Sequence, residues 1–139
     1  MTTELFWLVL TAILTSALWI PYIVGVNITP YEGKSDYFLR PPDQSKMTPW
    51  VHRSHRAQLN LVEQFVPFAA IVMVAHLLHV STPLTQWSVI AFFWLRVIHA
   101  AGMITGLARS PVRQIVFTAS WLSTVALAWQ VLAHSQWAT

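Results

Sequence analysis

Long runs of residues without charge are the feature that most constrains how this chain can fold. From Leu5 to Ile28 no side chain is charged, and a helix needs only ~20 apolar residues to cross the ~30 Å hydrocarbon core of a membrane. Three further apolar stretches of similar length follow. The sequence therefore predicts an all-α membrane bundle of four transmembrane helices with up-down topology. The expected spans, within a single domain of residues 1–139, are about residues 5–26, 49–80, 83–107 and 111–134.

The composition supports a membrane protein and excludes several other classes. Hydrophobic residues make up 55% of the chain and charged residues 9%, whereas about a quarter of residues are charged in soluble domains. The chain has no Cys, so it can form no disulfide, thiolate metal site or cysteine nucleophile. Its net charge of +3 is spread over connectors and helix ends, a pattern from which we expect no nucleic-acid partner.

The charged residues predict the orientation in the membrane. The only early charge is Glu4, whereas a cleaved signal peptide would begin with a basic segment, so we expect the first span to be retained. A polar loop at residues 27–48 and the connector near Arg109 carry basic residues, while the connector around Ser81 and both termini carry none. The positive-inside rule then predicts that loops one and three are cytoplasmic and that both termini lie on the opposite side.

Proline positions predict where helices begin and bend. Pro21 lies near the end of the first span, where it predicts a kink or the exit from the helix. Each later span is expected to begin at a hydroxyl residue followed by proline, because the hydroxyl can cap the helix and proline suits its first turn. These pairs are Thr48–Pro49, Thr82–Pro83 and Ser110–Pro111.

A stripe of polar side chains enters the second expected span. At ~100° per residue, its members fall within an arc of roughly 80° on one helix face. A charged side chain inside a bilayer costs a few kcal/mol, so this face must contact protein or trapped water. The stripe therefore predicts a binding site. We call Arg53, Arg56, Asn60, Glu63 and Pro67 the polar stripe.

One acid and one arginine lie deep in the expected spans. Glu63 is the only carboxylate after Asp43, and Arg96 is the only cation near the centre of the third span. Burying either without a partner is costly, so we predict a structural ion pair between them inside one subunit. A ligand could also use the same two charges, and the two interpretations are compatible.

Four arginines lie at the cytoplasmic ends of the last three spans, and we call Arg53, Arg56, Arg109 and Arg113 the cationic rim. Such residues commonly anchor helices by extending their charges to the membrane surface. Together with Asn60 and Glu63, however, they predict a pocket for a small anion that also carries amide and amine groups. His99 lies one turn after Arg96 on the same face, so we expect it to line this pocket.

Other kinds of site have weaker support. His52 with His55, and His76 with His79, have the spacing of paired metal ligands, but neither has an acidic or Cys partner on the same turn. A metal site needs three or four ligands, so we expect no metal. The sequence has neither a Gly-rich phosphate loop nor a Ser with an obvious base and orienting acid, and so it does not support a kinase or a serine hydrolase.

With these residues placed, nearly the whole chain resembles the MAPEG superfamily, the membrane-associated proteins in eicosanoid and glutathione metabolism. The second-span motif of that superfamily, Arg-Ala-x-x-Asn-x-x-Glu-x-x-x-Pro, is matched by Arg56, Ala57, Asn60, Glu63 and Pro67. A second segment is similar to the Arg-x-x-His and Arg-x-Pro-x-Arg segments of prostaglandin-synthase-like members. It comprises Arg96, His99, Arg109, Pro111 and Arg113.

The resemblance implies a homotrimer that binds glutathione as a cosubstrate between neighbouring subunits near the cytoplasmic face. It implies a transferase or peroxidase acting on lipophilic electrophiles or lipid hydroperoxides, which would enter from the surrounding lipid. The residue matching a catalytic arginine is Arg113, which would stabilise the glutathione thiolate, because a nearby cation lowers the pKa of a thiol. The residues expected to bind glutathione are Arg56, Asn60, Glu63 and His99, with Arg53 and Arg109 in the cationic rim.

Three positions depart from the family pattern. Met103 stands where many catalytic members have a Tyr that contacts glutathione, and Gln64 stands where some have another Tyr. Leu59 replaces an arginine of the prostaglandin-synthase-like members. An alternative is therefore a non-catalytic scaffold that binds lipid or glutathione. A third possibility, a small proton-coupled drug exporter, would need an essential Glu in the first span, which is uncharged from Leu5 to Ile28.

Overall fold

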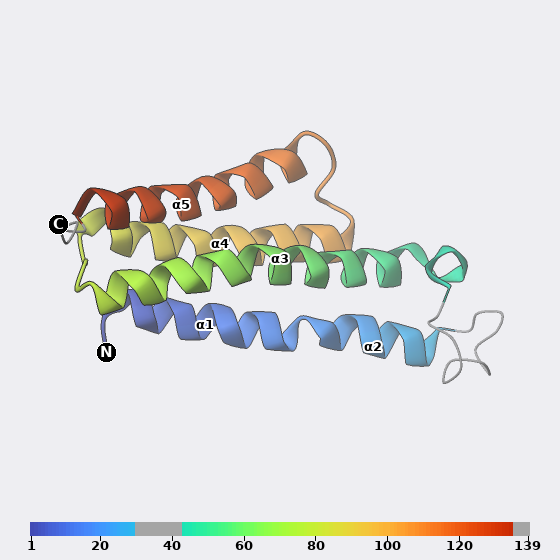
Figure 1. The fold of residues 1–139 in the computed structure, drawn as a ribbon. Helices are drawn as coiled ribbons and strands as arrows, with labels where there is room; N and C mark the ends of the chain where they lie inside the picture. The colour runs from blue at the N-terminus through green and yellow to red at the C-terminus, as the bar shows by residue number, and fades with distance from the viewer. Residues whose placement is uncertain (30–42, 135–139) are drawn as a thin grey trace.

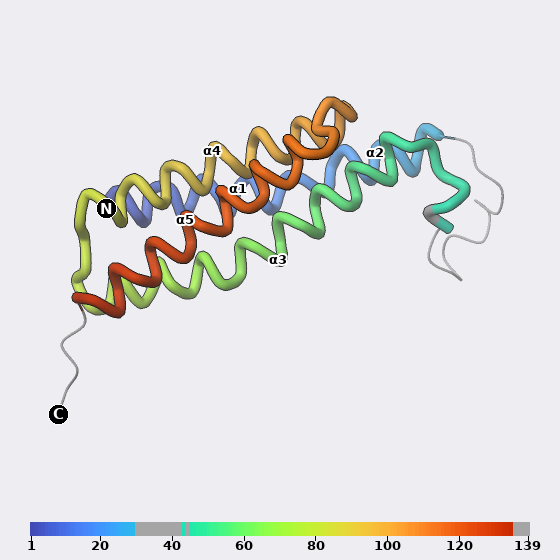
Figure 2. Tube along the Cα trace, turned by 90° about the horizontal axis from the view of Figure 1, so that it is seen from above, coloured from blue at the N-terminus to red at the C-terminus, as the bar shows by residue number. Residues whose placement is uncertain are grey.

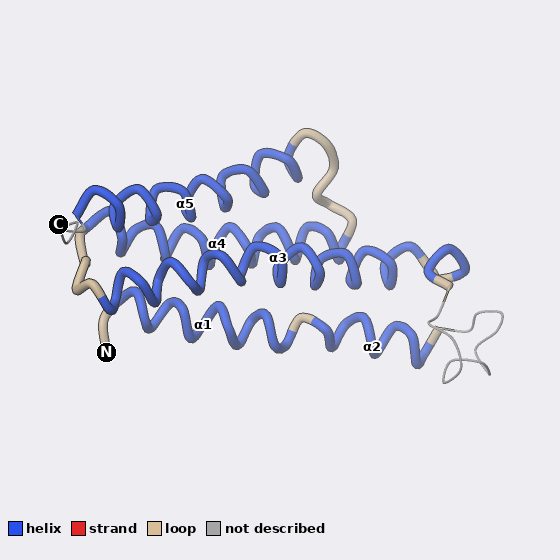
Figure 3. The backbone as a smooth tube through the Cα atoms, viewed as in Figure 1, coloured by secondary structure: helices blue, strands red, loops and turns tan. Residues whose placement is uncertain are grey.

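The computed structural model describes residues 1–29 and 43–134, and the described residues are helical apart from short connections (Figures 1 and 3). Four stretches are long and apolar enough to cross a membrane, namely Thr3–Ile28 and the three later helices. The all-α class is thus confirmed for the described residues, and so is the presence of four helices apolar enough to span a membrane. The elements are α1 (Thr3–Ala17), α2 (Trp19–Ile28), the 3₁₀ helix η2 (Gln44–Lys46), α3 (Pro49–Leu77), α4 (Pro83–Thr105) and α5 (Val112–His134). Most of the polar loop expected at 27–48, including Lys34 and Arg40, lies outside the described residues.

The first apolar stretch consists of two helices separated at Leu18 (Figure 3). The cause is Pro21, which has no N–H to donate to the carbonyl of Ala17 four residues earlier, so α1 ends there. The helix resumes at once and continues to Ile28. Pro21 therefore marks a kink, and the chain does not leave the helix at this point.

The start of α4 is fixed by a reciprocal cap. The Thr85 N–H donates to Thr82 Oγ1 at 3.2 Å, and the Thr82 N–H donates to Thr85 Oγ1 at 2.9 Å. Glu4, at the start of α1, is buried and its Oε1 accepts from Thr85 Oγ1 at 2.7 Å and from Ser81 Oγ at 2.9 Å. The reciprocal bonds satisfy backbone N–H groups at the N-terminus of α4. The bonds to Glu4 attach the start of α1 to the same place. The sequence analysis had used Glu4 only as evidence that the first span is retained.

The helices pack through separate apolar clusters. Near the α3–α4 connection, the rings of Phe68 and Phe92 stack at 3.8 Å and both are fully buried. Nearer the other end, Leu61 and Met103 belong to a second cluster. In Figures 1 and 2, α5 crosses the bundle obliquely, and its N-terminal half diverges from α3. Helix α5 therefore lies further from α3 near the α4–α5 connection than at its C-terminal end (Figure 2).

Arg53 closes the C-terminal end of α4. Its Nε donates to the Met103 carbonyl at 3.0 Å, and its Nη2 donates to the Ile104 carbonyl at 3.4 Å. The guanidinium lies against Gly106, which has φ 80° and where a Cβ would lie 3.1 Å from Nη2. A cation at a helix C-terminus satisfies carbonyls that have no partner inside the helix. Arg53 therefore has a structural role within the fold.

Candidate functional site

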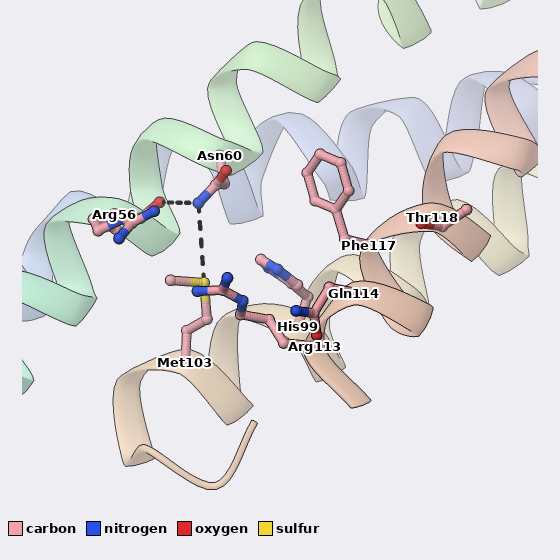
Figure 4. A pocket seen from close by; sticks show the side chains of 8 residues that line it. All are labelled: Arg56, Asn60, His99, Met103, Arg113, Gln114, Phe117 and Thr118. Atoms are coloured by element: carbon pink, nitrogen blue, oxygen red, sulfur yellow. Dashed lines mark hydrogen bonds between the residues drawn. The ribbon is translucent and has the colours of Figure 1, made fainter. Parts of the chain in front are cut away.

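A cavity of about 240 Å³ lies where α5 diverges, between α3, α4 and α5 (Figure 4). Its walls come from three short segments that are distant in the sequence. Helix α3 contributes Arg56 and Asn60, and α4 contributes His99 and Met103. The first turns of α5 contribute Arg113, Gln114, Phe117 and Thr118. We call this the polar cavity.

Asn60 holds the wall between α3 and α4. Its Nδ2 donates to the carbonyl of Arg56 at 2.7 Å and lies 4.0 Å from the sulfur of Met103. Arg56 is one turn earlier on α3 and is exposed. The two residues therefore share one face of α3, as the polar stripe predicted, and that face borders the cavity.

His99 and Phe117 form the deep wall. The His99 side chain is buried, and its Nδ1 has no hydrogen-bond partner among the described residues. Its ring lies 5.8 Å from that of Phe117, measured between ring centres. A buried imidazole nitrogen without a partner is a group that a ligand or an ordered water can satisfy.

The charge on the lining favours an anion. Arg56 and Arg113 each bring a guanidinium to the cavity from different helices, and none of the described residues that line it is an acid. In Figure 4 the Arg113 side chain points across the cavity toward Met103. Guanidinium groups form their strongest hydrogen bonds with carboxylates and other anionic oxygens. The site can therefore hold a small anionic molecule between α3 and α5.

The predicted ion pair between Glu63 and Arg96 is absent from the single subunit. Arg96 is 1% exposed, and none of its three side-chain nitrogens has a hydrogen-bond partner among the described residues. Its guanidinium carbon lies 5.7 Å from the centre of the Phe117 ring. Glu63 is exposed. The reason is its direction on α3, because Glu63 is turned ~200° from the buried Leu61 that packs toward α4.

The polar cavity gathers only part of the predicted site. It brings together Arg56, Asn60, His99 and Arg113. Of the other predicted residues, Arg53 binds the end of α4, whereas Glu63 and Arg109 are exposed and do not line the cavity. Sequence analysis did not identify three lining residues of α5. Helical spacing from Arg113 could have found them, because Gln114, Phe117 and Thr118 lie one, four and five positions later.

The two histidines near the other end of the bundle have an acidic neighbour after all. His76 and His79 line a cavity of about 160 Å³ together with Glu4, which comes from α1. Sequence spacing could not show this approach, since Glu4 is far away along the chain. Even so, the described residues contain no group of three or more His, Asp, Glu or Cys side chains that could hold a metal ion.

The chain matches a known protein family over most of its length. The family model described as the MAPEG family matches residues 5–133. This range contains α2, η2, α3 and α4 completely, and it omits only the first two residues of α1 and the last residue of α5. All eight residues of the polar cavity lie inside the match. No curated protein matches the chain.

Proposed function

Since this chain belongs to the MAPEG family, we propose that it is a membrane transferase or peroxidase that uses glutathione against lipophilic electrophiles or lipid hydroperoxides. The observation that carries the proposal is the polar cavity, in which two guanidiniums face a buried imidazole and no carboxylate is present among the lining residues. Glutathione carries two carboxylates, an ammonium group and a thiol. Its net negative charge complements this lining.

The lining offers a separate partner for each part of glutathione. Arg56 can bind a carboxylate, and the amide of Asn60 can bind the peptide or amino groups of the ligand. Arg113, on the other side of the cavity, is the cation available to the sulfur. Hydrogen bonds to charged groups contribute about 1.5–3 kcal/mol each, so losing one should weaken binding at least tenfold.

The same magnitude defines what Arg113 can do chemically. A free thiol has a pKa near 8.5, so only about 3% is thiolate at pH 7. An interaction of about 1.5–3 kcal/mol with the thiolate lowers that pKa by roughly one to two units. The thiolate fraction then rises to between about a quarter and three quarters. This thiolate is the nucleophile for conjugation or for reduction of a peroxide.

The proposal includes a homotrimer with glutathione between subunits. Ligand pockets usually have volumes of about 300–1,000 Å³, and the polar cavity of one subunit has about 240 Å³. Arg56 and Glu63 are exposed on α3. A neighbouring copy would enlarge the cavity and cover these charges, and Glu63 would then be available to the ligand's ammonium group. In this assembly the helices run up-down, the polar cavity faces the cytoplasm, and the acceptor arrives from the membrane lipids.

The experiment compares two variants that should fail in different ways. Arg56→Ala should weaken equilibrium binding of glutathione at least tenfold. Arg113→Ala should retain much of the binding but lose the ultraviolet absorbance of the thiolate and the conjugation of a model electrophile. Lys46→Ala is the matched control, because it removes a cation outside the cavity. If both cavity variants behave like the wild-type protein, the site is placed wrongly.

A non-catalytic scaffold that binds glutathione or lipid is the second candidate. The observation that favours it is Met103, which lies in the cavity 4.0 Å from Asn60 Nδ2 at a position where many catalytic relatives are expected to have a Tyr hydroxyl. A thioether is only a weak acceptor and cannot donate to sulfur. Wild-type protein that binds glutathione without forming any thiolate would support this candidate and exclude the first.

A further inference from the structure

A second cavity lies directly beside the polar cavity, between the end of α4 and the start of α5. Its volume is about 180 Å³. His99 and Arg113 line both cavities, so these two side chains form a shared wall. The rest of the lining is small or aliphatic, and we call this second space the apolar cavity. It is formed by Ile98, Gly102, Leu107, Ala108, Val112 and Val116.

One side of the apolar cavity is formed by a close backbone contact between α4 and the connection that follows it. The Ala108 N–H donates to the Gly102 carbonyl at 2.9 Å. A Cβ at Gly102 would lie only 2.7 Å from the Cβ of Ala108, so the connection after α4 can fold back closely only because residue 102 is glycine. The cavity therefore depends on a specific backbone contact and not on the position of one flexible side chain.

The entrance to the apolar cavity is itself apolar. Ile98 and Val112 are 54% and 56% exposed, and Leu107 is 81% exposed. All three lie on helices or a connection of the membrane-spanning bundle. We therefore expect a molecule dissolved in the lipid to approach the cavity along these aliphatic side chains, whereas glutathione would approach from water.

We propose that the apolar cavity is the acceptor subsite and that it selects compact electrophiles with a single aromatic ring. This inference rests on the proposed function, because it takes the thiolate to lie against Arg113 in the polar cavity. An engineered apolar cavity of about 150 Å³ binds benzene, so about 180 Å³ accommodates one substituted ring. A long acyl chain exceeds that volume, so this inference favours transfer to compact electrophiles over the reduction of lipid hydroperoxides.

The shared wall allows the two reactants to meet. In 1-chloro-2,4-dinitrobenzene, a compact electrophile of this kind, the thiolate sulfur attacks the ring carbon that carries chlorine and forms a carbon–sulfur bond. The carbon–chlorine bond then breaks, and its electron pair leaves with chloride. The thiol proton has already gone to water. Negative charge spreads over the ring and its nitro groups before the halide departs, and Arg113 lies on the side where it can stabilise that charge.

The test fills the apolar cavity and leaves the polar cavity unchanged. Val116→Phe places a ring in the space, and Val125→Phe, on the same helix but outside both cavities, is the matched control. We expect Val116→Phe to lower kcat/KM for 1-chloro-2,4-dinitrobenzene at least tenfold, while glutathione affinity and thiolate absorbance stay within twofold of wild type. Val112→Phe fills the same cavity from a more exposed position and replaces Val116→Phe if that variant does not fold.

Binding of an unreactive ring separates this inference from the proposed function. Quenching of tryptophan fluorescence by 1,3-dinitrobenzene, measured without glutathione, should show saturable binding to wild type and Val125→Phe and its loss in Val116→Phe. Equal binding to all three proteins, or equal kcat/KM, would overturn the subsite. A wild-type protein that binds the ring but never forms a thiolate would leave the subsite standing and overturn the proposed chemistry.

Discussion

Replacing Arg96 with Met should make the ligand-free protein more stable. The Arg96 guanidinium is 1% exposed, and its three nitrogens have no hydrogen-bond partner among the described residues. A buried charge that has lost its partner costs about 3–5 kcal/mol. Its contact with Phe117, at 5.7 Å, returns at most about 2 kcal/mol. The charge is therefore a net cost of about 1–3 kcal/mol, which Met removes while it keeps a similar unbranched shape.

The assay is thermal unfolding in mild detergent without any thiol. For a chain of this length 1 kcal/mol corresponds to about 3 °C, so Arg96→Met should raise Tm by roughly 3–10 °C. Leu95→Met, the adjacent position, controls for the effect of methionine itself. Glu63→Gln should leave Tm nearly unchanged, because Glu63 is exposed and unpaired with Arg96 in one subunit.

A decrease in Tm for Arg96→Met would refute this reasoning. It would mean that Arg96 has an acidic partner that a single subunit does not provide. Glu63 of a neighbouring copy is the first residue to test, and a double-mutant cycle between the two positions would measure the coupling. A coupling energy near zero would exclude that pair and direct attention to the ligand.

Three further changes test the packing, each by Tm in detergent. Gly102→Val should destabilise by about 1–3 kcal/mol, because its Cβ would lie 2.7 Å from that of Ala108; an unchanged Tm would contradict the close contact. Phe68→Ala removes a buried ring stacked at 3.8 Å and should cost about 3–5 kcal/mol, from lost burial and the cavity left behind; the exposed Val66→Ala is its control. Glu4→Leu should cost about 1.5–3 kcal/mol by removing the acceptor for Thr85 Oγ1 at 2.7 Å, and Glu4→Gln should lose less.

The features that sequence predicted well are those that depend on one helix at a time. Apolar length defined the four spans, and the Thr82–Pro83 pair marked the start of α4. Spacing along α3 placed Arg56 and Asn60 on one face, and the structure places both on the wall of one cavity. Each of these inferences needs only the rise and rotation of an α-helix, which are the same in every protein.

The failures concern how two helices face each other. Phe68 stacks on Phe92. In an antiparallel pair this contact brings two residues nearly level: Glu63, about 7.5 Å from Phe68 toward the N-terminus of α3, and Arg96, about 6 Å from Phe92 toward the C-terminus of α4. By this estimate the two residues lie at a similar depth in the bundle, but Glu63 is exposed and Arg96 is buried. Rotation about the axis depends on the packing of both helices, which spacing within one helix does not contain.

The break at Leu18 divides the first span into two helices that pack on different parts of the bundle. Trp7 and Leu8 of α1 pack on the cluster around Phe68, whereas Val26 of α2 packs with Val51 at the start of α3. Pro21 leaves the joint one backbone hydrogen bond weaker, so bending is easier here than elsewhere in either helix. We therefore expect α2 to tilt together with the start of α3, while the hydrogen bonds of Glu4 hold α1 against the start of α4.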